Sequence, residues 1–343
     1  MRKRILLPAL ALALLAAAAG AAAVPQDKEQ DRAKGTLPPT ILEKRWTWDF
    51  DGMLKRRMMR VLVPYSKTLY FIDRGQQRGL AYDAFKMFED EVNKRRKKGD
   101  LPFHVVFIPM ARGEFIQALK DGRGDVAMAY LTITPERLKE IDFTIPTAAN
   151  VSEIVVTGPG GPSVATAQDL SGQEVYLRQG SSYAQSVERL NEELKKAGRA
   201  PVRIRVAPDN LEAEDILEMV NAGLVPATIA DDFRAKFWKQ VFPKIELHPE
   251  AAVSGGGQMG WMIRKNSPLL KKELDAFITR YPEGSAVRNQ LLAKYLRNTR
   301  YVKNATSREE REKFDGVVKL FRKYCDEYDM DTLLMAAQGY QES

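Results

Sequence analysis

The segment from Asp125 to Pro146 holds the residue types that could bind a small acid. Its sequence, DVAMAYLTITPERLKEIDFTIP, places an apolar run before two threonines and a proline. A helix start is predicted at Pro135, and backbone amides at a helix N-terminus favour anions. The planar guanidinium of Arg137 matches the geometry of a carboxylate. We therefore predict a carboxylate-binding segment. The alternative is an ordinary helix cap with Arg137 in solvent.

A second segment could add to this site. A predicted strand at 174–177 is followed by Ser181 and Ser182 and then by a predicted helix at 184–197. A serine at this point caps the helix, and the free amides can hold an anion; a plain N-cap is the alternative. Asp231 follows the predicted strand 227–230, where a carboxylate points into the cleft of an open α/β sheet.

The elements that position these residues alternate between short apolar strands and amphipathic helices. This alternation argues for a parallel sheet with crossover helices. We expect the segment 149–157 to cross into a second lobe. The remaining expected strands are 60–63, 103–108, 126–130 and 202–206, and the expected helices are 80–96, 114–120, 212–222 and 267–281.

Composition excludes several classes of protein. With 343 residues, 44% hydrophobic and 29% charged, the chain suits a soluble globular protein of two domains. The net charge of +8 suits an anionic wall or membrane surface, and we predict no nucleic-acid partner. Cys325 is the only cysteine, and His104 lies far from His248, so we predict no disulfide, no metal and no cofactor.

The N-terminus has the pattern of a secretory signal peptide. Residues 1–23 combine a basic start, an apolar core and three closing alanines. An uncleaved anchor is the alternative, because the apolar run is just long enough to span a membrane. Residues 24–57 are polar, contain Pro-Pro and are expected to be a linker. We therefore expect a periplasmic location, with a peripheral position at the outer membrane left open.

From about 58 to 281, the motifs resemble the bacterial periplasmic solute-binding proteins of family 3, the amino-acid-binding type. The pattern D-x₆-T-x-T-x₂-R-x₃-I-D-F at 125–143 is the most specific part. The resemblance implies an α/β fold, the two-lobed periplasmic-binding-protein fold of type II, followed here by a short α-helical tail. Lobe one would comprise 58–148 and 253–281, and lobe two would comprise 149–252.

The resemblance also implies roles for individual residues. Thr132 and Arg137 of lobe one, with Ser182 of lobe two and Ser181 beside it, would hold the carboxylate of a ligand. Asp231 matches the acid that takes the ligand's ammonium group. Either Tyr70 or Phe71 lies near the aromatic position that covers the ligand.

This chain departs from the family's pattern at three positions. Arg112 stands where a second covering aromatic is usual, Tyr130 replaces a small residue, and Pro226 replaces an aspartate. An extra cation and an extra phenol suit a larger and more acidic ligand than a free amino acid. A peptide with a free carboxylate would fit that description.

The tail resembles a different kind of protein. Residues 282–308 are expected to be a connector, and 309–343 end in KYCDEYDMDTLLMAAQGYQES, which resembles the opening of the lysozyme-like domain of lytic transglycosylases of the membrane-bound F type. The resemblance implies that Glu342 is the general acid/base. Because that residue needs an enclosed apolar cleft and the sequence stops at Ser343, we expect no transglycosylase activity from these residues. The alternative is a C-terminal helix that packs on the lobes.

Two functions follow from the whole pattern. The first is a ligand-binding regulatory module of a peptidoglycan lytic transglycosylase, which would bind an amino acid or a cell-wall peptide, with peptidoglycan as a further partner. The second is a receptor that delivers amino acids to the permease of an ABC importer.

Overall fold

The computed structural model describes residues 44–73, 75–178, 180–299 and 302. The predicted signal peptide, the predicted linker up to residue 43 and the segment 309–343 with Glu342 lie outside the described residues. Within the described part, no helix has the length and apolar character needed to cross a membrane.

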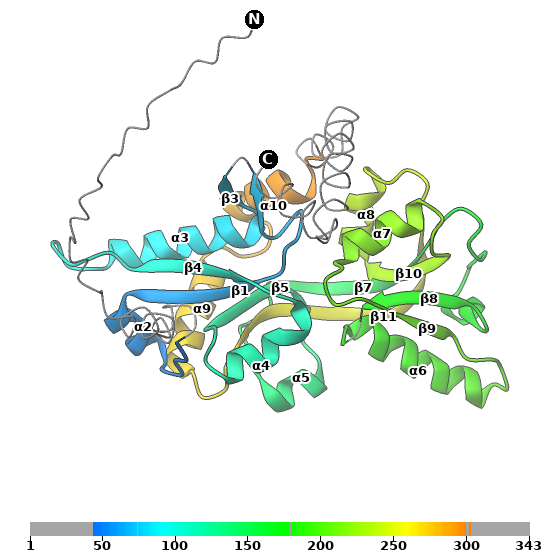
Figure 1. The fold of residues 1–343 in the computed structure, drawn as a ribbon, viewed down its shortest axis with the longest axis horizontal. Helices are drawn as coiled ribbons and strands as arrows, with labels where there is room; N and C mark the ends of the chain where they lie inside the picture. Colours follow the sequence, from blue (N-terminus) through cyan, green and yellow to red (C-terminus); the bar gives the residue numbers. More distant parts are fainter. Residues whose placement is uncertain (1–43, 74, 179, 300–301, 303–343) are drawn as a thin grey trace, which may run out of the picture. The chain divides into compact units, whose positions relative to one another are not determined.

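The core of lobe one is a parallel sheet with helices on both faces (Figure 1). Strand β1 pairs with β4 on one side and with β5 on the other. The connection from β1 to β4 and the return to β5 run in opposite directions along the sheet, so right-handed crossovers place α3 and α4 on opposite faces. These elements are β1 (Met58–Val63), α3 (Leu80–Lys94), β4 (His104–Pro109), α4 (Phe115–Lys120) and β5 (Val126–Thr132).

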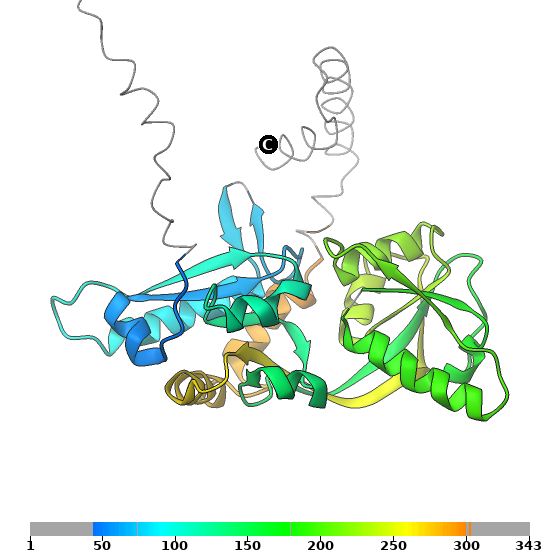
Figure 2. The same cartoon turned by 60° about the horizontal axis from the view of Figure 1, so that its bottom comes forward.

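Two long strands carry the sheet from lobe one into lobe two (Figure 2). Strand β7 (Ala148–Thr157) leaves lobe one, and the 18-residue β11 (Glu246–Ile263) returns antiparallel to it. The seven-stranded sheet has the order β10-β7-β11-β5-β1-β4, with the short β6 (Asp142–Phe143) paired to β11. The expected parallel pairing is present among β1, β4 and β5, whereas β7 and β11 pair antiparallel, because the two crossing strands run in opposite directions.

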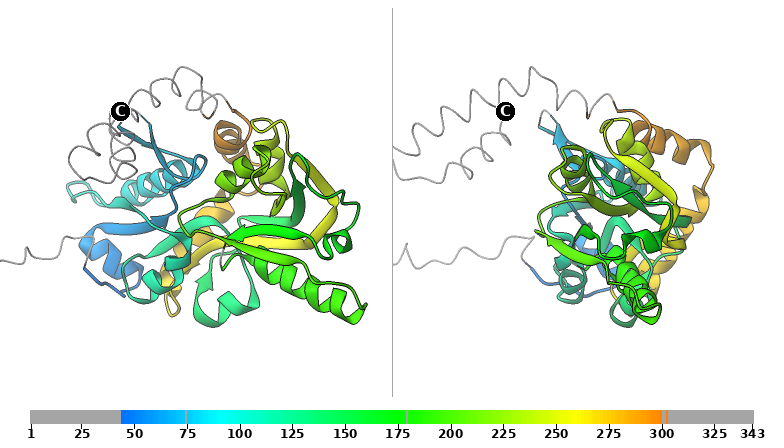
Figure 3. Two further views of the ribbon diagram at one scale, coloured as in Figure 1. Left: turned by 45° about the vertical axis from the view of Figure 1, so that its right-hand side comes forward. Right: turned by 90° about the vertical axis from the view of Figure 1, so that its right-hand side faces the viewer.

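Lobe two packs its helices on both sides of its strands (Figure 3). The parallel pair β8 and β9 stands apart from the seven-stranded sheet, while β10 joins that sheet beside β7. Helix α6 lies on one side of the strands, and α7 lies with α8 on the other. The elements are β8 (Glu174–Arg178), α6 (Ser182–Lys196), β9 (Arg203–Ala207), α7 (Ala213–Asn221), β10 (Ala227–Asp231) and α8 (Asp232–Lys239).

Each lobe has its own hydrophobic core. In lobe one, the ring of Phe88 packs edge-on against Phe277 of α9 (Pro268–Arg280), and Phe85 contacts Trp261 of β11. In lobe two, separate apolar clusters lie beneath α6 and beneath α8, where Trp238 stacks on Phe242. The predicted two-lobed α/β fold is confirmed.

Two helices lie in the segments that we expected to be a linker and a connector. Helix α2 (Phe50–Arg56) falls inside the predicted linker 24–57, so the expected linker is wrong at its end. The side chain of Asp49 caps α2 and also accepts two amides at the start of α9, while the apolar face of α2 enters the core of lobe one. Helix α10 (Ala286–Leu296) lies in the predicted connector and contacts α3.

Candidate functional site

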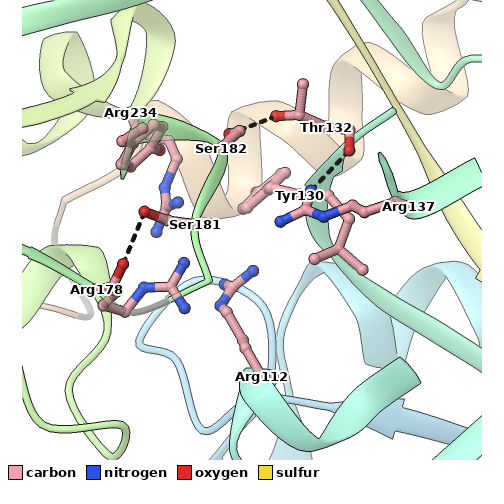
Figure 4. Close-up of a pocket in the computed structure, with 10 residues that line it drawn as sticks. Arg112, Tyr130, Thr132, Arg137, Arg178, Ser181, Ser182 and Arg234 are labelled. Atoms are coloured by element: carbon pink, nitrogen blue, oxygen red, sulfur yellow. Dashed lines mark hydrogen bonds between the residues drawn. The ribbon is translucent and has the colours of Figure 1, made fainter. Parts of the chain in front are cut away.

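A small pocket lies where lobe one meets lobe two (Figure 4). Its cavity volume is about 10 Å³, which is room for about one water molecule. The lobes are therefore closed on each other here, and a ligand needs them to part. The lining residues are Arg112, Tyr130, Leu131, Thr132 and Arg137 of lobe one, with Arg178, Ser181, Ser182, Tyr183 and Arg234 of lobe two.

Arg137 enters the pocket from the short helix α5 (Pro135–Glu140), which begins at Pro135 as predicted and is capped by Thr134. Its Nη1 donates to the Thr132 carbonyl at 2.6 Å, and its Nη2 donates to the Gly180 carbonyl of lobe two at 3.2 Å. Arg137 forms no ion pair with a described residue. Burial lowers the pKa of Arg137, and the nearby charge of Arg112 lowers it further.

The two serines of lobe two stand at the start of α6. The Ser181 hydroxyl accepts a hydrogen bond from the Ala184 amide at 3.3 Å and donates to the Arg178 carbonyl at 2.8 Å. The Ser182 hydroxyl donates to the Thr132 hydroxyl across the cleft at 3.2 Å. The predicted cap is therefore present, and the structure brings Thr132, Arg137, Ser181 and Ser182 together.

Arg112 is held by a carboxylate that the sequence analysis did not single out. It stands in a 3₁₀ turn (Arg112–Glu114), and its guanidinium lies 2.7 Å from Glu212 at the start of α7. Both side chains are buried, and Arg112 also donates to the Ala129 carbonyl. The extra cation that we expected to select an acidic ligand is therefore neutralised within the protein. It joins the two lobes instead.

Asp231 lies at the end of β10, as predicted, but it does not line the pocket. It is 1% exposed, and its carboxylate lies 3.6 Å from Arg234 Nη1. Neither carboxylate oxygen accepts a hydrogen bond of normal geometry from a described residue, although the Tyr183 hydroxyl lies close to the carboxylate. Burial raises the pKa of Asp231 to about 6, against the opposing effect of Arg234.

Arg234 was missed by the sequence analysis, although it stands three residues after Asp231 at the start of a helix. Its Nη2 lies 3.2 Å from Glu214, which also accepts from the Ser66 hydroxyl of lobe one at 2.7 Å. A charged network thus crosses the cleft here. Arg178, at the end of β8, was also missed, and its position at a strand's C-terminal edge was the available signal.

Tyr130 adopts a left-handed backbone conformation inside β5, with φ of 50°. For a residue with a side chain this costs roughly 1–2 kcal/mol. The conformation sends the ring toward lobe two, where it meets Phe233 edge-on at 5.3 Å and lies 5.4 Å from the guanidinium of Arg234. Strain at such a position is typical of a binding site.

The structure does not bring Tyr70 or Phe71 into the lining of the pocket. Tyr70 is buried and stacks on Phe107 at 5.5 Å. Phe71 begins the short strand β2 (Phe71–Asp73), which pairs with β3 (Gln76–Arg78), and its ring faces Tyr295 of α10. The predicted covering role is therefore not met in this closed arrangement, because both rings pack within lobe one.

The fold and this cleft define a two-lobed ligand-binding protein. The family model of bacterial extracellular solute-binding proteins, family 3, matches residues 61–298. The chain belongs to that family.

The curated relatives share this region and extend beyond it. The chain is 25% identical over 295 residues to a membrane-bound lytic murein transglycosylase F of Ectopseudomonas mendocina, covering 83% of this chain and 56% of the relative. It is 29% identical over 247 residues to a protein of the same name from Maricaulis maris, covering 67% and 49%. The chain thus spans about half the length of these relatives.

Solved structures with the same fold include amino-acid-binding proteins. An ancestral arginine-binding protein bound to arginine superposes with a TM-score of 0.57 at 23% identity, covering 70% of this chain and 98% of that one. The substrate-binding protein of an amino-acid ABC transporter gives 0.57 at 16% identity, covering 70% and 100%. At these identities the likeness shows the fold.

Proposed function

We propose that this chain is the ligand-binding, regulatory module of a protein like lytic transglycosylase F, and that it binds an amino acid or a cell-wall peptide through a carboxylate. The observation that carries the proposal is Arg137. This arginine points into the pocket between the lobes, and its guanidinium has only carbonyl oxygens as partners among the described residues. A guanidinium in that position lacks the anion that it binds best.

The surrounding groups suit the same ligand. The Ser182 and Thr132 hydroxyls meet across the cleft and can both turn to a carboxylate. Helix α6, with 15 residues, starts beside them and adds the positive end of its dipole. A ligand carboxylate would replace the two carbonyl acceptors of Arg137 with a charged one and would hold both lobes at once.

The regulatory part of the proposal draws on the relatives. These relatives are named lytic murein transglycosylases, and the part of this chain that aligns with them includes the family match. In this proposal peptidoglycan fragments reach the module in the periplasm, and Glu342 belongs to the cutting domain. A second candidate is the receptor of an amino-acid ABC importer, which the fold of the transporter-associated binding protein supports.

Calorimetric titration of the chain with free amino acids and with muropeptides tests the proposal. Arg137→Ala is expected to weaken the best ligand by roughly 2–5 kcal/mol, because a desolvated carboxylate loses its charged partner. Arg205→Ala, an exposed arginine of β9, is the control and is expected to bind normally. Equal affinity in Arg137→Ala would contradict the proposal. Tighter binding of muropeptides favours the regulatory module, and tight binding of one free amino acid alone favours the transport receptor.

A further inference from the structure

Arg178 is a cation in the pocket wall for which the described part of the chain supplies no acceptor. Its side chain extends from the end of β8 into the pocket, and among the described residues its guanidinium has neither a hydrogen-bond acceptor nor an ion-pair partner. Structural arginines of this protein are different. Arg60, which is fully buried, donates to the carbonyls of Lys44 and Gly122 and to the carboxylate of Asp125.

Two of the four arginines that line the pocket have a carboxylate partner among the described residues. Arg112 is paired with Glu212, and Arg234 is paired with Glu214 and Asp231. The lining holds two further arginines, and neither of them forms an ion pair with a described residue: Arg137 and Arg178.

Another buried carboxylate lies nearby but serves a different contact. Glu153, on β7 beside Asp231, accepts a hydrogen bond from the Ser186 hydroxyl at 2.5 Å and does not line the pocket. It therefore offers neither arginine a direct partner.

The guanidinium groups of Arg112, Arg137 and Arg178 point toward one another in the pocket (Figure 4). Like charges brought together away from water repel, and a bound anion relieves that repulsion. Burial, and then the charge of Arg112, lowers the pKa of Arg178 to about 10. At neutral pH the side chain is still a cation, so the wall of lobe two presents a positive charge toward Arg137 of lobe one.

We propose that the site takes a ligand with two acid groups, one held by Arg137 and the start of α6 and the second held by Arg178. This inference rests on the proposed function and narrows it to a chemical class. The ligand is an acidic amino acid, or a short peptide that carries such a residue, rather than a neutral amino acid. Arg178 is then the residue that selects the second acid group.

The test compares glutamate with glutamine, because the two differ only in replacement of the second acid by an amide. Calorimetry with glutamate and glutamine, and with alanyl-glutamate and alanyl-glutamine, separates a free amino acid from a peptide. A charge-assisted hydrogen bond is worth roughly 1.5–3 kcal/mol, so we expect the acid to bind about tenfold to a hundredfold more tightly than its amide.

Arg178→Gln is expected to remove this preference: glutamate binding falls by about tenfold or more, and glutamine binding stays within about twofold. Arg205→Gln, an exposed arginine on the paired strand β9, is the control and is expected to keep the preference. Arg178→Lys keeps the positive charge but lacks the paired donors of the planar guanidinium, and it is expected to give an intermediate ratio of glutamate to glutamine affinity. If Arg178→Gln does not fold, the ratio of glutamate to glutamine affinity in the unaltered chain tests the inference, and equal affinities overturn it.

The outcomes separate this inference from the proposed function. Suppose that glutamine binds as tightly as glutamate and that Arg137→Ala abolishes the binding of both. The proposed binding of a carboxylate by Arg137 is then supported, and the inference of a ligand with two acid groups is overturned. If the preference survives in Arg178→Gln, Arg178 is not the selecting residue and the inference is likewise overturned. If no free amino acid, no dipeptide and no muropeptide binds, both proposals fail.

Discussion

Replacement of Asp231 by asparagine is expected to stabilise the ligand-free protein at neutral pH. The carboxylate is almost fully buried, and its pKa is raised from 3.8 to about 6 even though the nearby Arg234 guanidinium and Tyr183 hydroxyl favour the ionised form. One pKa unit corresponds to 1.36 kcal/mol, so the ionised form costs about 3 kcal/mol in the folded state. Asparagine avoids this cost, since it carries no charge at any pH.

The pH dependence follows from the direction of that shift. The folded protein binds the proton of Asp231 more tightly than the unfolded chain does, so stability is lost as pH rises from about 4 to about 6. Asp231→Asn should lack this loss. Denaturation with urea at pH 4 and pH 7.5 is expected to give nearly equal stabilities at pH 4, and a gain of about 3 kcal/mol at most for the variant at pH 7.5.

Other carboxylates titrate in the same range, and the difference between the variant and the unaltered chain isolates Asp231. Asp51→Asn, at an exposed position on α2, is the control and is expected to change stability little at either pH. If Asp231→Asn is destabilised equally at pH 4 and pH 7.5, the carboxylate is not strained in the way described.

Two further changes test the contacts that close and order the cleft. Arg112→Ala leaves Glu212 buried without its cation and is expected to cost roughly 3–5 kcal/mol of stability in urea denaturation. The double variant Arg112→Met with Glu212→Leu should recover much of that loss. No recovery in the double variant would contradict the importance of the ion pair. Ser181→Ala removes the cap of α6 and is expected to cost roughly 0.5–2 kcal/mol in thermal unfolding, whereas Ser181→Asp should retain stability. A Ser181→Ala variant as stable as the unaltered chain would contradict the role of the cap.

The parts of the site that could be predicted depend on signals within a few residues. The strand, turn and helix start around Thr134 and Arg137 follow from local propensity and capping, and the structure has them where they were expected. Ser181 caps its helix for the same reason, although that helix starts two residues before the predicted Ala184. Each element forms by rules that need no knowledge of the other lobe.

The charge partners could not be predicted in this way. Arg112 and Glu212 are 100 residues apart, and they meet only because the two crossing strands bring the lobes together. Arg178 has no ion-pair partner among the described residues because the nearby carboxylates pair with Arg112 and Arg234. The glycine-rich part of β11 was also difficult, since Gly255 and Gly256 interrupt the alternation of a strand while the pairing with β7 continues through shifts of register.

The central claim is that Arg137 binds a ligand carboxylate between the two lobes. A crystal structure of the chain with its tightest-binding amino acid or muropeptide tests it directly. We expect both guanidinium nitrogens of Arg137 to lie within hydrogen-bond distance of a ligand carboxylate, with Ser182 on the opposite side. A ligand bound elsewhere, or Arg137 still bonded to the Thr132 and Gly180 carbonyls beside a bound ligand, would contradict the claim.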